Sequence, residues 1–279
     1  MLKNNRKSSA YPIRDIWLLM PGLFGFLLFY VIPLFMMPGY AVTKNAMNHT
    51  FVGMANFLRV WKNAYFRLAL KNTFVFSACA VFLTLSAALL LAFLLRMLRC
   101  DRCSVFVTPY FLPTASVCTV FAAFLPAGSL NGTLGSGMEE WLTLLVFYLW
   151  KYTGIQMVIL IGGLSRIPKE VEDAAAVDGA SALQKLIYIQ LPLLQPALVF
   201  CTLFGLSSCM RIYRESYSLY GQYPVRSVYQ LQHYLYNHFT KLNYQYLSAA
   251  ALSFLVLYFL AAALPVWLEN RLSKEMNGE

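Results

Sequence analysis

The sequence is short of charge. Only 12% of its 279 residues are charged and 59% are hydrophobic, whereas about a quarter of the residues in an ordinary soluble domain are charged. The mean hydropathy is +0.57. Such a chain would expose too much apolar surface to water, so we expect it to lie in a lipid bilayer. The net charge of +10 does not indicate nucleic-acid binding, because the basic residues form no stripe apart from the apolar runs.

The sequence also lacks the patterns on which most catalytic and metal sites depend. It contains no G-x4-GK-[ST] phosphate-binding loop, so we expect no ATP to bind to this chain. Its three histidines have no metal-binding spacing, and the C-x-x-C motif of Cys100 and Cys103 has no second pair. We therefore predict no catalytic residues, no metal and no cofactor in this chain. An integral-membrane enzyme is disfavoured because the acidic residues lie mostly in expected loops.

Long apolar runs are what the sequence has instead. A helix needs about 20 mostly apolar residues to cross the hydrocarbon core of a bilayer. The candidate spans are 16–37, 70–95, 104–125, 141–164, 196–210 and 246–267, of which the fifth is the shortest. Each should be helical, because backbone polar groups cannot stay unpaired in lipid. The predicted fold is an all-α polytopic membrane protein with six transmembrane helices in a domain 16–268, between an N-terminal segment 1–15 and a tail 269–279.

The distribution of Lys and Arg predicts an orientation. With the N-terminus inside, the inner segments carry a modest excess of basic residues over the outer segments. The N-terminal segment itself has four basic residues and one acid. Because Lys and Arg favour the cytoplasmic side, both termini are predicted to be cytoplasmic. The loop 166–195 between the fourth and fifth spans is then cytoplasmic as well.

This loop is polar for such an apolar chain, and it carries helix signals. Pro168 suits the first turn of a helix, and the acidic residues after it complement the positive end of the helix dipole. Gly179 suits the left-handed conformation that ends a helix, and Ser181 with Gln184 has the pattern of a capping box. Pro192 is expected to end the second helix. These features predict two short helices joined at Gly179, and on their own they fit an ordinary amphipathic connector equally well.

The run DAAAVDGA…IQLPLLQP within this loop resembles the EAA signature of ABC-importer permeases. That signature has an acid, two alanines, an Asp-Gly-Ala and, further along, a Leu-Pro. The matching residues are Asp173, Ala174, Ala175, Asp178, Gly179, Ala180, Leu191 and Pro192. The leading acid is Asp173 where the family usually has Glu. The neighbouring Glu172 offers the longer side chain in its place.

Other parts of the chain resemble the same family. WLLMPGLFGFLLFYVIPL is similar to the first span of carbohydrate permeases of the maltose and glycerol-phosphate type, and FVGMANFLRVWKNAYFRLALKNTF to the outer segment before their second span. GSLNGTLG resembles their outer loop before the fourth span. After the fifth span, LYGQYP keeps only Gly221 and Pro224 of a Gly-Gly-Pro element that is frequent in the family.

The resemblance implies a fold, a function and a set of partners. The implied fold is that of type I ABC importer permeases. The implied function is the ATP-driven, binding-protein-dependent import of a sugar or oligosaccharide across the cell membrane of a prokaryote. The implied partners are a second homologous permease, two cytoplasmic ATPase subunits that bind ATP and Mg, an external solute-binding protein and the lipid bilayer. The EAA loop would couple the ATPase to the spans, and the substrate would cross by alternating access.

Polar residues within or beside the spans are candidates for the substrate pathway, because such residues usually face the interior of a bundle. They are Tyr110, Asn131, Trp150, Lys151, Tyr152, Gln156, Ser207, Ser208, Arg211 and Glu215. Aromatic rings and amides suit sugars, which have apolar ring faces and many hydroxyls. Structural explanations stay open. In the structural explanation, Lys151 extends its ammonium group to the membrane surface or pairs with an acid of a neighbouring helix, and Trp150 serves only in packing. Arg211 and Glu215, four residues apart, pair with each other.

The main alternative function is that of a stand-alone secondary carrier or channel. Such a protein would need no docking loop, and it usually shows an internal duplication with broken spans. This sequence shows no convincing internal repeat. The importer subunit is therefore the favoured prediction.

Overall fold

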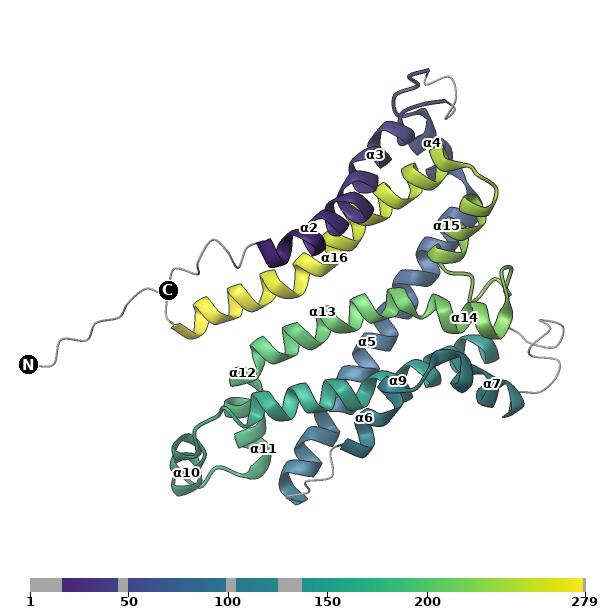
Figure 1. Cartoon of the computed structure of the whole chain (residues 1–279). Coiled ribbons are helices and arrows are strands. Elements are labelled where there is room, and N and C mark those ends of the chain that lie inside the picture. Colours follow the sequence, from purple (N-terminus) through teal and green to yellow (C-terminus); the bar gives the residue numbers. More distant parts are fainter. Residues whose placement is uncertain (1–16, 45–49, 99–103, 125–136, 278–279) are drawn as a thin grey trace, which may run out of the picture.

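The computed structural model describes residues 17–44, 50–98, 104–124 and 137–277. Within these ranges every regular element is a helix, apart from one antiparallel bridge between Thr43 and Phe51. The long helices form a bundle, and shorter helices join them at both ends (Figure 1). The prediction of an all-α membrane protein is therefore confirmed.

Five helical segments are long and apolar enough to cross a membrane, and a bent helix pair makes a sixth crossing if it counts as one span. The crossing segments are η1 (Trp17–Leu19), α2 (Met20–Phe26), η2 (Leu27–Val31) and α3 (Ile32–Ala41); α5 (Ala64–Leu98); α6 (Ser104–Phe111) with α7 (Thr114–Phe124); α9 (Met138–Leu164); α13 (Gln195–Arg211) with α14 (Tyr213–Tyr220); and α16 (Tyr244–Asn277). The connecting helices are α4 (Ala55–Lys62), α10 (Lys169–Val177), α11 (Ala182–Lys185), η3 (Leu186–Gln190), α12 (Leu191–Leu193) and α15 (Leu231–Thr240).

The third crossing differs from the straight span expected over 104–125. α6 ends at Phe111, α7 begins at Thr114, and the two helices are bent by 102°. Pro113 lies in the break. Proline lacks the N–H that a helix interior uses, and it disfavours helical backbone at the residue before it. The apolar run continues through this proline, so a criterion of apolar length alone gives one unbroken span.

Several other helices extend past the predicted ends of the spans. α5 begins at Ala64 and α9 at Met138, and α16 continues to Asn277 through most of the predicted tail. The fifth crossing is not the short segment expected, because α14 follows α13 directly and the two together cover 26 residues. Apolar windows mark only the lipid-facing part of a helix. The helices run on because their backbone hydrogen bonds do not depend on apolar side chains.

Close approaches in the centre of the bundle fix the position of the bent pair. A Cβ at Gly154 of α9 would overlap the carbonyl oxygen of Phe106 in α6, so only glycine fits there. Tyr148 of α9 is fully buried, and its hydroxyl donates to the carbonyl oxygen of Gly205 in α13 at 2.8 Å. Small residues allow helices to pack closely in membranes. Together these contacts hold α6 and α13 against α9, which positions the site described below.

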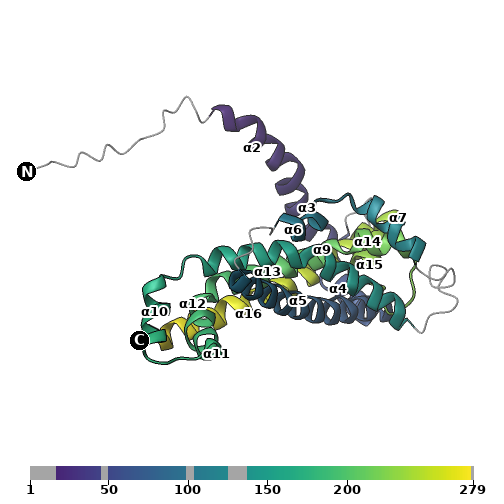
Figure 2. The same cartoon turned by 90° about the horizontal axis from the view of Figure 1, so that it is seen from below.

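The first crossing stands partly outside the bundle. In Figure 2, α2 projects away from the other helices, whereas α3 packs along α16. Of Met20–Ala41, only Ala41 at the end is buried within the chain itself. This helix therefore presents apolar side chains outward, as a lipid-facing or subunit-facing helix does.

Candidate functional site

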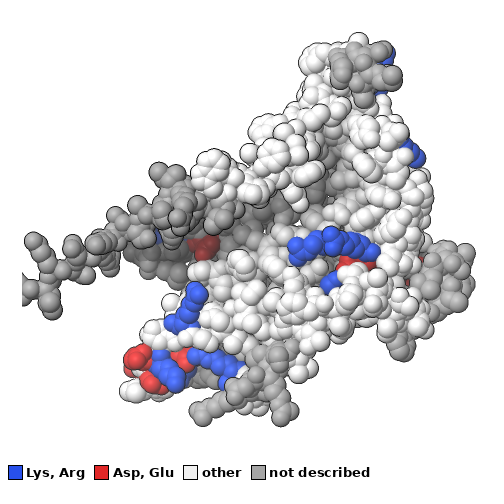
Figure 3. All heavy atoms as spheres, viewed as in Figure 1, with Lys and Arg blue, Asp and Glu red and all other residues white. Residues whose placement is uncertain are grey.

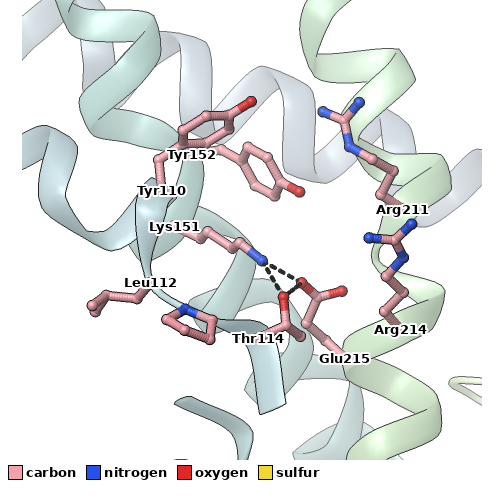
Figure 4. Close-up of a pocket in the computed structure, with 9 residues that line it drawn as sticks. Tyr110, Leu112, Thr114, Lys151, Tyr152, Arg211, Arg214 and Glu215 are labelled. Atoms are coloured by element: carbon pink, nitrogen blue, oxygen red, sulfur yellow. Dashed lines mark hydrogen bonds and ion pairs between the residues drawn. The ribbon is translucent and has the colours of Figure 1, made fainter. Parts of the chain in front are cut away.

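A polar cavity of about 330 Å³ opens at the bend between α6 and α7. It is lined by Tyr110, Leu112, Pro113, Thr114, Lys151, Tyr152, Arg211, Arg214 and Glu215. The lining comes from α6, the break, α7, α9 and the α13–α14 junction (Figure 4). We call this cavity the bend pocket. The break in the third crossing thus opens a polar space inside a bundle whose helices are otherwise strongly apolar.

Lys151 and Glu215 form a buried ion pair in the bend pocket. Lys151 Nζ lies 2.6 Å from Glu215 Oε1, and it also donates to Thr114 Oγ1 at 2.8 Å. The side chains of Lys151 and Glu215 are 10% and 2% exposed. A charge buried without a partner would be strongly destabilising, whereas a paired and hydrogen-bonded one is tolerated. In the structure, Lys151 therefore pairs with an acid of a neighbouring helix, which was one of the explanations open for it.

The expected pair between Arg211 and Glu215 is not among the ion pairs of the described residues. Arg211 Nη2 instead donates to Ser208 Oγ at 2.7 Å. A turn at Ile212 separates α13 from α14, so the two residues do not lie on one regular helix. The carboxylate consequently faces Lys151 of α9, which spacing along the sequence could not indicate.

The charged lining of the bend pocket is mainly basic. Its charged side chains are three basic ones, Lys151, Arg211 and Arg214, and one carboxylate, that of Glu215. Lys151 forms an ion pair with this carboxylate. Both arginine side chains extend from the α13–α14 junction toward the pocket (Figure 4). In the space-filling view, a blue group with a smaller red one stands at the position of α14, on a mostly white surface (Figure 3). The pocket therefore attracts groups of negative charge.

An aromatic layer packs beside the bend pocket. The rings of Tyr110, Tyr152 and Phe204 contact one another, with centroids 5.9, 6.2 and 6.5 Å apart. Tyr152 follows Lys151 toward the C-terminal end of α9, and Phe204 precedes Arg211 in α13. Phe204 thus lies nearer than Arg211 to the end of the bundle that carries loop 166–195. Phe204 also stacks 5.9 Å below the Arg211 guanidinium, a favourable cation–π contact.

Trp150 and Ser207, two of the pathway candidates, do not line the bend pocket. Trp150 packs against the rings of Phe121 and Phe147. Ser207 shares a hydrogen bond of 2.9 Å with the hydroxyl of Tyr258 in α16. The packing explanation given above for Trp150 is therefore the one that its contacts support.

Gln156 and Ser208 lie near the bend pocket without lining it. Gln156 is fully buried, and its Nε2 would lie 3.3 Å from a Cβ at Gly205 of α13. Ser208 is fully buried and acts through Arg211, whose guanidinium it holds. The remaining candidate, Asn131, lies outside the described residues.

Sequence reasoning missed Thr114 and Arg214 as pocket residues. Pro113 signals a break directly before Thr114, and this signal was available in the sequence. Arg214 adjoins Glu215 in a polar stretch, but nothing in that stretch indicates which of its side chains point toward the same space. Only the packing of α14 against α7 and the contact of Glu215 with Lys151 of α9 settle that direction.

The segment after α14 supports the pocket from outside the spans. His233 of α15 is fully buried, and its Nε2 lies 3.4 Å from Ser216 Oγ, next to Glu215. Its Nδ1 accepts from the backbone N–H of Gln230 at 3.2 Å, so Nε2 carries the proton of the neutral ring and donates to Ser216. Burial lowers the pKa of His233 to about 4. The neutral ring thus braces α14 at physiological pH.

Loop 166–195 has the two-helix form predicted from its sequence. α10 ends before Gly179, which has a φ of +80°, and Ser181 begins the next helix. Both hydrogen bonds of the capping box between Ser181 and Gln184 are present. Asp173, Ala174, Asp178 and Gly179 are exposed. An open surface depression lies beside them, lined by Asp178, Gly179, Ala180, Gln184, Tyr188 and Ile189.

The expected helix end at Pro192 is wrong. The π-helix η3 (Leu186–Gln190) continues into α12, and Pro192 lies in the first turn of α12. A wider helical turn shifts the hydrogen-bond pattern, and the first turn of a helix needs no proline N–H. The chain therefore passes from the loop toward α13 without the sharp stop that the proline suggested.

Glu172 faces inward rather than standing in for Asp173 on the exposed side. Arg96 Nη2 of α5 donates to both oxygens of its carboxylate, at 2.9 and 3.0 Å. Gln190 Nε2 donates to the same carboxylate at 2.8 Å. Arg96 Nη1 also donates to the carbonyl oxygen of Leu164 at the end of α9. One guanidinium thus joins α10 to α5 and α9, at the end of the bundle opposite the bend pocket.

A family model now accounts for most of these elements. The model of the binding-protein-dependent transport system inner membrane component matches residues 102–274, which include the bend pocket and the two-helix loop. The chain belongs to this family. The family membership confirms the resemblance drawn from the loop signature, and it makes the chain a permease subunit of a binding-protein-dependent ABC importer.

Curated relatives of this importer subunit are similar over most of its length. The lactose transport system permease protein LacF of Rhizobium radiobacter is 25% identical over 239 residues, which is 78% of this chain and 80% of that protein. The arabinooligosaccharides transport system permease protein AraP of Bacillus subtilis is 26% identical over 222 residues, or 72% and 70% of the two chains. Both are permeases of carbohydrate transport systems by name.

A solved structure shares the fold of this permease. It is the crystal structure of a bacterial ABC transporter involved in the import of the acidic polysaccharide alginate. One of its chains superposes with a TM-score of 0.77 at 19% identity, over 93% of this chain and 97% of that one. At this identity the likeness concerns the fold, and it confirms the predicted permease architecture.

The family also establishes where the chain acts and what it does not do. The permease is a multi-pass inner-membrane protein of bacteria, and it is a transport subunit rather than an enzyme. ATP is bound by the partner ATPase of such an importer. Within the residues that the structure describes, no group of three or more His, Cys, Asp or Glu side chains could hold a metal ion.

Proposed function

We propose that this permease carries a sugar or oligosaccharide by alternating access through the bend pocket. The observation that supports this most is a polar and aromatic cavity at a break in a membrane-crossing helix. Irregular backbone at membrane depth is tolerated where it lines a cavity. Tyrosine rings and charged groups in the same cavity suit the ring faces and hydroxyls of sugars. The names of the relatives LacF and AraP point to the same class of substrate.

Loop 166–195 couples this pathway to ATP hydrolysis in a partner chain. Its exposed acids, small residues and surface depression present a docking surface to a cytoplasmic ATPase subunit. Glu172 and Arg96 carry the movement of α10 into α5 and α9. α9 then bears on the bend pocket through Lys151 and Tyr152. A displacement of the loop therefore reaches the pocket along one rigid helix.

The complete importer contains this chain, a second homologous permease, two ATPase subunits and an external solute-binding protein. One chain supplies at most six crossings, and two permeases together enclose the pathway. The loop helices α10 and α11 lie at the same end of the bundle as the C-terminal end of α16 (Figure 1). This arrangement supports an orientation with both termini and the loop on the cytoplasmic side.

The test is charge reversal on the exposed side of the loop. The chain is purified gently from its membrane, co-purifying chains are identified by mass spectrometry, and ATP-driven sugar uptake is measured after reconstitution. The double variant Asp173→Lys with Asp178→Lys should lose the ATPase and fall to background uptake while the permease stays in the membrane. Glu170→Lys, an exposed acid of the same helix outside the signature, is the matched control and should retain both.

The alternative function has its own outcome in this experiment. A stand-alone carrier would purify alone, transport without ATP and tolerate the double variant. That result would replace the importer mechanism, and loop 166–195 would then be only a connector.

A further inference from the structure

Two arginines of the bend pocket have no acidic partner. Among the described residues, the ion pairs are those of Arg96 with Glu172 and of Lys151 with Glu215. Arg211 contacts neutral groups, the hydroxyls of Ser208 and Tyr152 and the ring of Phe204, and the ion pairs of the described residues include none of Arg214. Both arginines are exposed in this single chain and line the pocket, so their guanidinium groups are accessible to a negatively charged ligand. The pocket thus offers two positive charges that form no ion pair among the described residues.

A second polar group in the pocket, a carboxylate oxygen, lacks a hydrogen-bond donor. Glu215 Oε2 is buried and, in the part of the chain that the structure describes, has no hydrogen-bond partner. Glu215 itself is only 1% exposed, and its other oxygen is taken by Lys151. A buried carboxylate oxygen without a donor is costly. Because Glu215 lines the pocket, a hydroxyl of the occupant reaches this oxygen once the carboxylate turns toward it.

From these two observations we infer that the substrate is a carbohydrate that carries an anionic group, a carboxylate or a phosphate. The inference rests on the proposed function and narrows its substrate class. Arg211 and Arg214 bind the anionic group, and Glu215 Oε2 accepts a hydroxyl of the same molecule. A neutral sugar would satisfy the carboxylate but leave both guanidiniums unmatched. A simple inorganic anion would satisfy the guanidiniums but offer no hydroxyl to the carboxylate.

The geometry of the pocket fits such a molecule. The two arginines are three residues apart across the α13–α14 junction, and both side chains extend toward the pocket (Figure 4). Guanidinium groups suit carboxylate and phosphate because their planar donors match two oxygens at once. Tyr110 and Tyr152 line the same pocket. The pocket therefore offers guanidinium groups to a negative charge and aromatic rings to a sugar ring.

The test uses the complete importer, with its ATPase and binding protein, reconstituted into liposomes. The probes are digalacturonate and glucose 6-phosphate, each beside its uncharged counterpart, galactobiose or glucose. The variants are Arg211→Gln and Arg214→Gln. Arg214→Lys retains the charge and controls for folding. Lys62→Gln, which removes an exposed cation of α4 far from the pocket, is the matched control.

We expect at least one anionic probe to be taken up in preference to its neutral counterpart. Each Arg→Gln variant should reduce that uptake about tenfold or more, the effect of losing a hydrogen bond to a charged group. Arg214→Lys should keep most of the uptake, and Lys62→Gln should behave as the unchanged protein. Which probe is preferred decides between carboxylate and phosphate.

Three results would overturn the inference. One is uptake of the neutral probes only, which leaves the sugar importer intact but removes its preference for charge. Another is an equal effect of the Arg→Gln variants on anionic and neutral probes. The third is loss of the second permease from the purified variants, which would mean that the arginines pair with an acid of that subunit. If ATP drives uptake of no probe, the proposed function fails, and this inference fails with it.

Discussion

Among the residues that the structure describes, each end of the bundle contains one ion pair, and the two pairs differ in how deeply they are buried. Lys151 and Glu215 at the bend pocket are 10% and 2% exposed, whereas Arg96 and Glu172 at the loop are 30% and 22% exposed. The first pair joins α9 to α14 inside the membrane-crossing region. The second joins α5 to α10 where the spans meet the loop.

The difference separates a fixed element from an adjustable one. A deeply buried pair is lost only at a large free-energy penalty, because each partner would leave an uncompensated charge. A half-exposed pair exchanges protein contacts for water at little net change. The pocket end is therefore held in one arrangement, while the loop end can re-form its contacts as an ATPase moves it.

The largest effect should follow from removing one partner of the buried pair. Glu215→Ala leaves Lys151 beside two arginines, and we expect the free energy of unfolding to fall by about 3–5 kcal/mol. The double variant Lys151→Met with Glu215→Leu should recover much of that loss. Thermal unfolding and folded yield of the purified chain measure both. A loss for Glu215→Ala no larger than that for Glu172→Ala would remove the distinction between the two ends.

An intermediate effect should appear on acidification. The pKa of His233 is about 4 in the folded chain and about 6.5 when unfolded. Between these values the unfolded chain binds more protons, so stability falls as the pH falls from 6.5 toward 4, by roughly 2 kcal/mol at pH 5. Because His233 braces α14, the pocket end should loosen first. Site-specific hydrogen exchange measures this in the unchanged protein and in His233→Gln, whose curve should be flatter.

The smallest effect should come from the loop pair. Glu172→Gln removes the charge but keeps a partner for Gln190, and we expect a loss of about 1 kcal/mol or less. Raising the salt concentration should shrink that loss further, because exposed pairs are screened. The same salt series should leave the effect of Glu215→Ala nearly unchanged. A salt-independent effect of Glu172→Gln would show that the two pairs are alike in their access to solvent.

The sequence predicted the loop well because its signals are local. Gly179 and the Ser181–Gln184 capping box act through neighbouring backbone groups, so their spacing alone determines the two short helices. The number of crossings was predictable for a similar reason, since each long apolar run needs no partner to be recognised. The prediction at Pro192 failed because the π-helix before it continues into α12 with the proline in its first turn. That adjustment depends on the packing of the whole segment.

The pocket could be predicted only in part. Lys151, Arg211 and Glu215 were recognisable as polar residues in apolar surroundings, but their partners come from helices far apart in the sequence. Glu215 lies 64 residues from Lys151, and only the close approach of α6 and α9 at Gly154 brings the bend to that place. Charge at depth thus identifies candidate residues, whereas the tertiary packing decides which of them meet.

The break at Pro113 has an electrical consequence. The last carbonyls of α6 and the first N–H groups of α7 lack helical partners across a 102° bend, so they must be satisfied by polar side chains or by water at membrane depth. Hydration at that depth shortens the dry part of the crossing. On this side of the pathway, small ions then meet the layer of rings formed by Tyr110, Tyr152 and Phe204. A smaller side chain in that layer should make the resting membrane leak ions, even where sugar transport is unchanged.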